Sequence, residues 1–207
     1  MSGFAALTRL QQGVAQLKAD DLLRNRLLLE SPQGAHVRVN GRDVVSFCSN
    51  DYLGLANAPA LIAAAREALE QYGVGAGASH LITGHHQLHE AFESAFAAFV
   101  GKPAALLFST GYMANLGVMT ALLDRHGEVF ADKLNHASLN DAAALCGAKF
   151  SRYAHGALEQ LEGQLARSTA RDKLVVSDLV FSMDGDIADV DGLLSLAERH
   201  DAWLYLD

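Results

Sequence analysis

Residues that could do chemistry follow four apolar segments of this sequence. AALLF (104–108) leads into Gly111 and Tyr112, EVFA (128–131) into His136, LVVS (174–177) into Ser182, and AWLYL into Asp207. If these segments are strands of one parallel sheet, their carboxyl ends lie along one edge, where open α/β sheets bind ligands. A helix start, an imidazole, a hydroxyl and a carboxylate would then share one site.

The stretch STGYMANLG predicts a glycine turn and then a helix that begins near Tyr112. The unpaired N–H groups and the positive dipole end of such a helix favour an anion, most naturally a phosphate. The same pattern is typical of an ordinary capped helix that binds nothing. The local sequence leaves both interpretations open.

His136 stands in ADKLNHASLND, soon after the apolar segment that ends at Ala131. An imidazole at this place could stack on a planar ligand or transfer a proton. The alternative is a surface or capping histidine. We expect Ser138 or Asn135 to cap the helix that follows.

The acidic and histidine clusters favour no metal. DGDIADVDG lacks the glutamate that closes an EF-hand loop, so we interpret it as a turn beside the hydroxyl of Ser182. His85 and His89 lack the intervening glutamate of an HExxH zinc site.

The glycines of segment 73–79 lie between two predicted helices, which indicates a close backbone approach to a ligand or a subunit partner.

Apolar segments alternate with Ala/Leu-rich helical stretches in most of the chain. Helices are predicted over 58–71, 88–99, 112–123, 156–167 and 190–199. This alternation indicates βαβ units around a mostly parallel sheet with helices on both faces. An amphipathic helix over about 4–29 and a hairpin at Asn40-Gly41 precede it. We therefore expect a helix and hairpin segment, 1–50, and an α/β domain, 51–207.

Composition narrows the partners. The 207 residues include 16 basic and 24 acidic side chains, a net charge of −8, which argues against nucleic acid. No segment is apolar for long enough to suggest a membrane span or a signal peptide. Cys48 and Cys146 are far apart and lack metal-ligand spacing, which predicts two reduced core thiols in a cytoplasmic protein.

Pyridoxal 5'-phosphate is a cofactor that needs all four of the predicted groups together. Its phosphate suits a helix start, its ring suits an imidazole, and its protonated pyridine nitrogen suits a carboxylate. A carboxylate beside that cation stays ionised. Asp207, at the end of a predicted strand, is the candidate for this last role.

Six motifs resemble, in order and in register, those of the α-oxoamine synthases, a family of fold-type I pyridoxal-phosphate enzymes. They are FCSNDYLGLANAP, GASHLITGHHQLHE, LLFSTGYMANLGVMTALL, DKLNHASLNDAA, FSMDGDIADVDGL and AWLYLD. The resemblance runs from about residue 20 to Asp207. It implies an aspartate-aminotransferase-like large domain, incomplete at the C-terminus and lacking the small domain.

The motifs are most similar to the branch that makes 8-amino-7-oxononanoate in biotin biosynthesis. This implies a decarboxylative Claisen condensation of L-alanine with pimeloyl-CoA or pimeloyl-acyl carrier protein, in a homodimer with pyridoxal 5'-phosphate. The branches that make 5-aminolevulinate or 2-amino-3-oxobutyrate remain alternatives. So does a non-catalytic partner subunit without the Schiff-base lysine.

The resemblance also implies roles for single residues. Gly111 and Tyr112 contribute to the phosphate and cofactor site, and Ser182 bonds the cofactor. His136 stacks on the pyridine ring and also meets substrate. Asp207 pairs with the pyridinium nitrogen, so that His136 and Asp207 are the expected catalytic residues.

Two further residues match substrate positions of the family. Arg24 could meet the far carboxylate of the pimeloyl chain, although Arg26 is a near neighbour with the same charge. Asn50 is a candidate for the carboxylate of the amino acid. The glycine segment 73–79 is expected to approach the active site of a second subunit.

The sequence departs from the family pattern at two places. Gly156-Ala157 stands where the family has Asn-Asp, a change at a helix start with no expected effect on catalysis. The Schiff-base lysine of the family falls after the last residue of this sequence. None of the five lysines present matches it: Lys18, Lys102, Lys133, Lys149 and Lys173. We therefore expect residues 1–207 to be an amino-terminal part that does not turn over alone.

Overall fold

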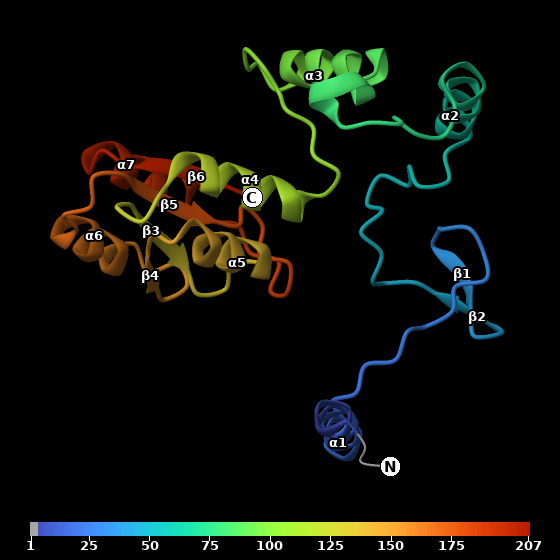
Figure 1. The fold of residues 1–207 in the computed structure, drawn as a ribbon, viewed down its shortest axis with the longest axis horizontal. Helices are drawn as coiled ribbons and strands as arrows, with labels where there is room; N and C mark the ends of the chain where they lie inside the picture. Colours follow the sequence, from blue (N-terminus) through green and yellow to red (C-terminus); the bar gives the residue numbers. More distant parts are fainter. Residues whose placement is uncertain (1–3) are drawn as a thin grey trace. The chain divides into compact units, whose positions relative to one another are not determined.

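The computed structural model describes residues 4–207 (Figure 1). The chain divides into two compact units, one that ends at Gly84 and one that runs from His85 to Asp207. Each unit has its own secondary structure, and the second contains the large hydrophobic clusters.

The first unit begins with helix α1 (Ala5–Ala19). The helix ends ten residues before the predicted end at 29, because Asp21 takes a positive φ of 55° that breaks the helical path. Strands β1 (His36–Val39) and β2 (Arg42–Val45) pair antiparallel as predicted. Asn40 and Gly41 between them have φ values of 48° and 75°, as a two-residue type I′ hairpin turn requires.

Helix α2 (Pro59–Tyr72) and a short π-helix, η1 (His80–Gly84), complete this unit. Pro59 begins α2, where its missing N–H costs nothing, and Gly73 ends it with a φ of 79°. Gly84 is buried, and a Cβ there would lie 1.9 Å from the carbonyl oxygen of Ala78. Only glycine therefore fits the end of η1.

The second unit is built on a parallel sheet. Its strands are β3 (Glu128–Asp132), β4 (Lys149–Tyr153), β5 (Lys173–Ser177) and β6 (Trp203–Leu206), in the spatial order β4-β3-β5-β6. All three neighbouring pairs are parallel, so the carboxyl ends of the four strands lie at one edge. This confirms the predicted parallel sheet.

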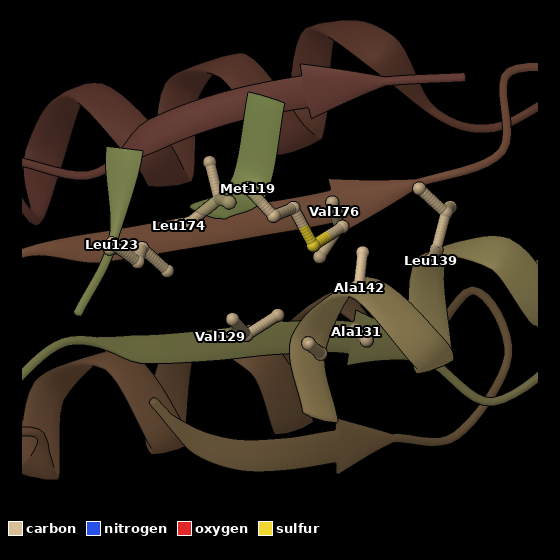
Figure 2. Packing of buried hydrophobic residues seen from close by; sticks show 9 residues of the cluster. Met119, Leu123, Val129, Ala131, Leu139, Ala142, Leu174 and Val176 are labelled. Atoms are coloured by element: carbon tan, nitrogen blue, oxygen red, sulfur yellow. The ribbon is translucent and has the colours of Figure 1, made fainter. Parts of the chain in front are cut away.

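Helices cover both faces of the sheet, as predicted. Helices α4 (Gly111–Leu122) and α5 (Ala137–Cys146) pack on the face that carries Val129, Ala131 and Val176 (Figure 2). Helices α6 (Leu158–Arg167) and α7 (Val190–Arg199) contribute leucines to the opposite face, with Phe130 and Val175. Successive side chains of β3 and β5 point to opposite faces of the sheet, and both faces are covered by helices. Side chains on both faces are therefore buried, which explains the continuous apolar stretches in the sequence of these strands.

Two predictions about strands need correction. Residues 104–108 were predicted as a strand but do not form one, because no strand within 4–207 pairs with them. The Leu107 N–H donates instead to Glu93 Oε1 (2.7 Å), which belongs to helix α3 (Gln87–Phe99). Strand β4 was not predicted. It lies at an edge of the sheet, and its sequence KFSRY mixes charged and aromatic residues where the central strands are apolar.

The remaining helix predictions hold to within two residues at each end. One cap was wrong: His136, and not Ser138 or Asn135, is the N-cap of α5, and its ring accepts from the Ser138 N–H. Cys48 is exposed and not a core thiol, while Cys146 is half-buried; both are free. Within residues 4–207, no helix has the length and hydropathy needed to cross a membrane.

Candidate active site

Helix α4 begins at the carboxyl edge of the sheet. Thr110 is its N-cap and accepts the Met113 N–H through Oγ1 (3.1 Å). The N–H groups of Gly111 and Tyr112 have no acceptor among residues 4–207 and remain available at the positive end of a twelve-residue helix. The Tyr112 hydroxyl donates to Asp141 on α5, and this bond raises the pKa of Tyr112.

Asp207 follows β6 directly. Its N–H donates to the Ser177 carbonyl (3.0 Å), and its carbonyl accepts the Leu179 N–H (2.8 Å), which continues the β5-β6 ladder past the end of the strand. Its side chain is exposed, and Oδ2 accepts from Asn115 Nδ2 on α4 (2.9 Å). The carboxylate is therefore joined to the same helix whose first turn has free N–H groups.

Asn115 lies four residues after Gly111, so it is one turn further along the same side of α4. Its side chain is buried at 2% exposure. Nδ2 also donates to Ser138 Oγ (2.8 Å), and Oδ1 accepts from the Tyr205 hydroxyl (2.6 Å). Burial, followed by the negative charge of Asp207, raises the pKa of Tyr205.

His136 lies at the start of α5 with an exposed imidazole. Its Nδ1 is 2.6 Å from Ser138 Oγ and accepts the Ser138 N–H at 3.3 Å. Its backbone N–H donates to Asp178 Oδ1 (3.1 Å). The pKa of Asp178 is raised, mainly by burial. The hydrogen bond from the His136 N–H acts to lower this pKa, and the negative charge of Asp207 acts to raise it further.

Asn135 fixes the loop that carries His136. Its Nδ2 donates to the Val176 carbonyl (2.9 Å), and its Oδ1 accepts the Asp178 N–H (3.1 Å). Both contacts cross from the end of β3 to the end of β5, and Asn135 is buried. The loop after one strand is therefore anchored to the loop after the next.

Ser182 lies in an exposed turn after β5. A second histidine holds this turn: His155 Nε2 is 2.8 Å from Asp186 Oδ2, and its Nδ1 is 3.1 Å from Oδ1 of the buried Asp132. The His155 ring also meets Phe181 edge to face, with 4.4 Å between ring centroids. We call the three polar residues, His155, Asp132 and Asp186, the histidine clamp.

The structure brings several predicted site residues together and leaves others apart. Hydrogen bonds connect Asp207 through Asn115 and Ser138 to His136, and Gly111 and Tyr112 begin the helix that carries Asn115. No bond within residues 4–207 joins Ser182 to this network. Arg24 and Asn50 belong to the first unit, where both are exposed.

Sequence reasoning missed three polar residues near the carboxyl edge of the sheet. Asn115 and Asp178 are buried, His155 is exposed, and none of the three was singled out. Only the place of Asn115, one turn after the glycine of a predicted anion-binding helix, offered a signal. His155 directly precedes Gly156-Ala157, where the sequence departs from the family pattern, but its contacts come from residues 23 and 31 positions away.

The fold defines a protein of the α/β class, with polar groups gathered at the carboxyl edge of its parallel sheet. Residues 42–207 match the family model of aminotransferase class I and II, and the chain belongs to this family. Solved relatives agree: a serine palmitoyltransferase from S. paucimobilis with a bound PLP-myriocin aldimine is 30% identical, with a TM-score of 0.89 over 100% of this chain and 53% of that chain. The fold is that of fold-type I pyridoxal-phosphate enzymes, as predicted.

Other relatives carry one particular name. The 8-amino-7-oxononanoate synthase of Thiobacillus denitrificans is 73% identical over 98% of this chain and 52% of its own length. An 8-amino-7-oxononanoate synthase structure from Francisella tularensis is 32% identical, with a TM-score of 0.65 over 78% of this chain and 44% of that chain. The chain therefore spans about half the length of the curated relatives it matches, and its predicted resemblance to this branch is confirmed.

Proposed function

We propose that residues 1–207 form the cofactor-binding half of an 8-amino-7-oxononanoate synthase. In this proposal the whole protein condenses L-alanine with a pimeloyl thioester, with loss of carbon dioxide and release of the thiol carrier. The observation that carries it is the hydrogen-bonded series Asp207, Asn115, Ser138 and His136 beside the free helix start at Gly111. The 73% identity to the 8-amino-7-oxononanoate synthase of Thiobacillus denitrificans supports the choice of this reaction.

The residues at this edge fit pyridoxal 5'-phosphate. Two unpaired N–H groups at the start of α4, from Gly111 and Tyr112, suit a phosphate. A Cβ on Gly111 would meet nothing within 4 Å, so the helix start is open. Asp207 Oδ2 accepts from Asn115, and its other oxygen has no donor among residues 4–207, so it can accept a bond from a protonated ring nitrogen.

Each residue has a distinct task in this proposal. When bound, the cofactor supplies an electron sink for the carbanion of the amino acid. Gly111 and Tyr112 hold the phosphate, and His136 covers the ring and orients it. Asp207 keeps a proton on the ring nitrogen, because an ionised carboxylate stabilises the adjacent cation. Ser182 contributes a hydroxyl to the cofactor.

The substrate and assembly assignments belong to the same proposal. Arg24 binds the distant carboxylate of the pimeloyl group, and Asn50 binds the carboxylate of alanine. The whole protein is a cytoplasmic homodimer, in which the glycine segment 73–79 reaches the partner's site. Residues 1–50 are an amino-terminal segment, and 51–207 belong to the large domain.

The test uses an extended protein, in which residues 1–207 are joined in register to the remaining half of the Thiobacillus denitrificans relative. It is incubated with pyridoxal 5'-phosphate, L-alanine and either pimeloyl-CoA or pimeloyl-acyl carrier protein. We expect 8-amino-7-oxononanoate and carbon dioxide in equal amounts by mass spectrometry. Glycine in place of alanine should give no more than a trace of product.

Two substitutions at opposite ends of β6 make a matched pair. Asp207→Asn should abolish product formation and weaken cofactor binding, whereas Asp201→Asn, an exposed residue before the strand, should do neither. A preference for glycine would overturn the substrate assignment. Cofactor binding by the Asp207→Asn variant equal to that of the unchanged protein would overturn the role of Asp207.

A further inference from the structure

Asn115 is a buried amide whose hydrogen bonds all lead to the candidate site. Both protons of Nδ2 are used, one by Ser138 Oγ and one by Asp207 Oδ2, and Oδ1 accepts from the Tyr205 hydroxyl. A flipped amide would place its carbonyl oxygen against the carboxylate of Asp207. The surroundings therefore permit one orientation of the side chain.

The orientation of Asn115 fixes the direction of the next bond. Ser138 is fully buried, and its Oγ accepts from Asn115, so its own proton is free to point to His136 Nδ1, 2.6 Å away. The Ser138 N–H is directed at the same nitrogen. Two donors facing Nδ1 make this nitrogen an acceptor, and a neutral His136 then carries its proton on Nε2.

We propose that Asn115 and Ser138 are positioning residues that couple the two groups expected to face the cofactor ring. Asn115 holds one oxygen of the Asp207 carboxylate, and Ser138 holds His136 as its Nε2–H tautomer. The inference rests on the proposed function for its link to the cofactor. The tautomer of His136 does not depend on the cofactor and can be measured without it.

The bond pattern predicts a specific effect of Asn115→Asp in the extended protein. The new carboxylate faces Asp207, and it also accepts the proton of Ser138, which can then no longer donate to His136 Nδ1. We expect the affinity for pyridoxal 5'-phosphate to fall about tenfold or more, since one charge-assisted bond is replaced by repulsion. In the cofactor-free protein, the ¹⁵N signal of His136 Nδ1 should move away from that of an acceptor nitrogen.

Further variants separate positioning from folding. Asn115→Leu removes the donor without adding charge, and we expect a loss of affinity of about fivefold. Ser138→Ala keeps the Asn115 bond to Asp207, so it should change cofactor affinity less than about twofold and yet alter the His136 signal. Thr120→Val is the control on α4, because Thr120 Oγ1 bonds only to carbonyls of its own helix; it should change neither measurement.

A double variant, Asn115→Asp with Asp207→Asn, exchanges the two side chains. The bond between positions 115 and 207 can form again with the donor on the other side, so the thermal stability lost in Asn115→Asp should return. Cofactor affinity should not return, because the acid is no longer at position 207. This outcome would separate the bond between positions 115 and 207, which the exchange restores, from the acid at position 207, which it does not.

The results distinguish this inference from the proposed function. If Asp207→Asn loses the cofactor but both Asn115 variants bind it within twofold of the unchanged protein, the coupling is wrong and the proposed function stands. If Ser138→Ala leaves the His136 signal unchanged, the Ser138 hydroxyl does not position His136; if Nδ1 of the unchanged protein gives the signal of a protonated nitrogen, the tautomer assignment is wrong. If the unchanged extended protein does not bind the cofactor, the proposed function fails, and with it the link from these residues to the cofactor.

Discussion

The histidine clamp predicts that the turn 181–187 is held more firmly at low pH than at high pH. Burial works to lower the pKa of His155, but bonds and charge from Asp132 and Asp186 outweigh it and raise the pKa above the ordinary value of about 6.5. A group with a raised pKa in the folded state stabilises that state fully below the unfolded value. Its contribution is lost as pH rises through the raised pKa.

The size of the effect follows from the exposure of the two acids. The side chain of Asp132 is 3% exposed, and that of Asp186 is 43% exposed. A bond between a charged pair contributes about 1.5–3 kcal/mol when sheltered and about 1 kcal/mol or less when exposed. We therefore expect His155→Gln to loosen the turn by about 2–3 kcal/mol near pH 5.5, and by about 1 kcal/mol near pH 9, where one neutral bond remains.

Hydrogen exchange of the turn measures this directly in the extended protein. The N–H groups of Phe181 and Gly185 are bonded within the turn, so their exchange reports its opening. The ratio of exchange rates, His155→Gln to unchanged protein, cancels the intrinsic effect of pH. It should be about 30- to 140-fold at pH 5.5 and about fivefold at pH 9, since 1.4 kcal/mol corresponds to a factor of ten.

Two variants of the same turn serve as partner and control. Asp186→Asn should give a part of the His155→Gln effect, whereas Asp184→Asn, an exposed acid not bonded to His155, should give none. A ratio that stays constant from pH 5.5 to 9, or that rises with pH, would refute the clamp.

Three further predictions concern stability, measured by thermal or urea unfolding of the extended protein. Met119→Ala should cost about 2–5 kcal/mol, because Met119 is fully buried between α4 and the sheet (Figure 2). Gly192→Ala should cost about 1–3 kcal/mol, since the new Cβ would lie 2.3 Å from Leu158 Cδ1. Burial acts to raise the pKa of Glu128, but bonds from Lys149 and two serines hold it below the usual range, so Glu128→Gln should cost about 1–3 kcal/mol at pH 7 and progressively less as pH falls through that lowered pKa.

The central strands and their helices could be predicted because local pattern and burial agree there. β3 and β5 have apolar side chains in their middle positions, with buried polar residues only at their ends, and they lie between helices on both faces. β4 could not be predicted in this way, because an edge strand is covered on fewer sides and tolerates residues such as Lys149 and Arg152. The segment 104–108 failed for the opposite reason: its pattern is that of a strand, but pairing depends on a neighbour and not on the segment itself.

The site divides along a similar line. His136 and Asp207 were singled out as candidates because each follows a recognisable apolar segment. Asn115 was not found, because an asparagine within a helix has no local mark of function, and its partners Ser138 and Asp207 come from 23 and 92 positions away. The local sequence shows which side chains follow a strand. Only the three-dimensional structure shows that the buried amide of Asn115 is hydrogen-bonded to Ser138 and Asp207.

The 92 positions between Asn115 and Asp207 also order events in time. Helix α4 can form early from local contacts, but its amide meets the carboxylate of Asp207 only after β6 has paired with β5. A contact across 92 positions of the chain forms slowly. A ligand that needs both residues binds the assembled sheet and not its precursors, and thereby stabilises it. The pairing of β6 with β5 would then be the moment at which Asn115 and Asp207 first form a common surface for such a ligand.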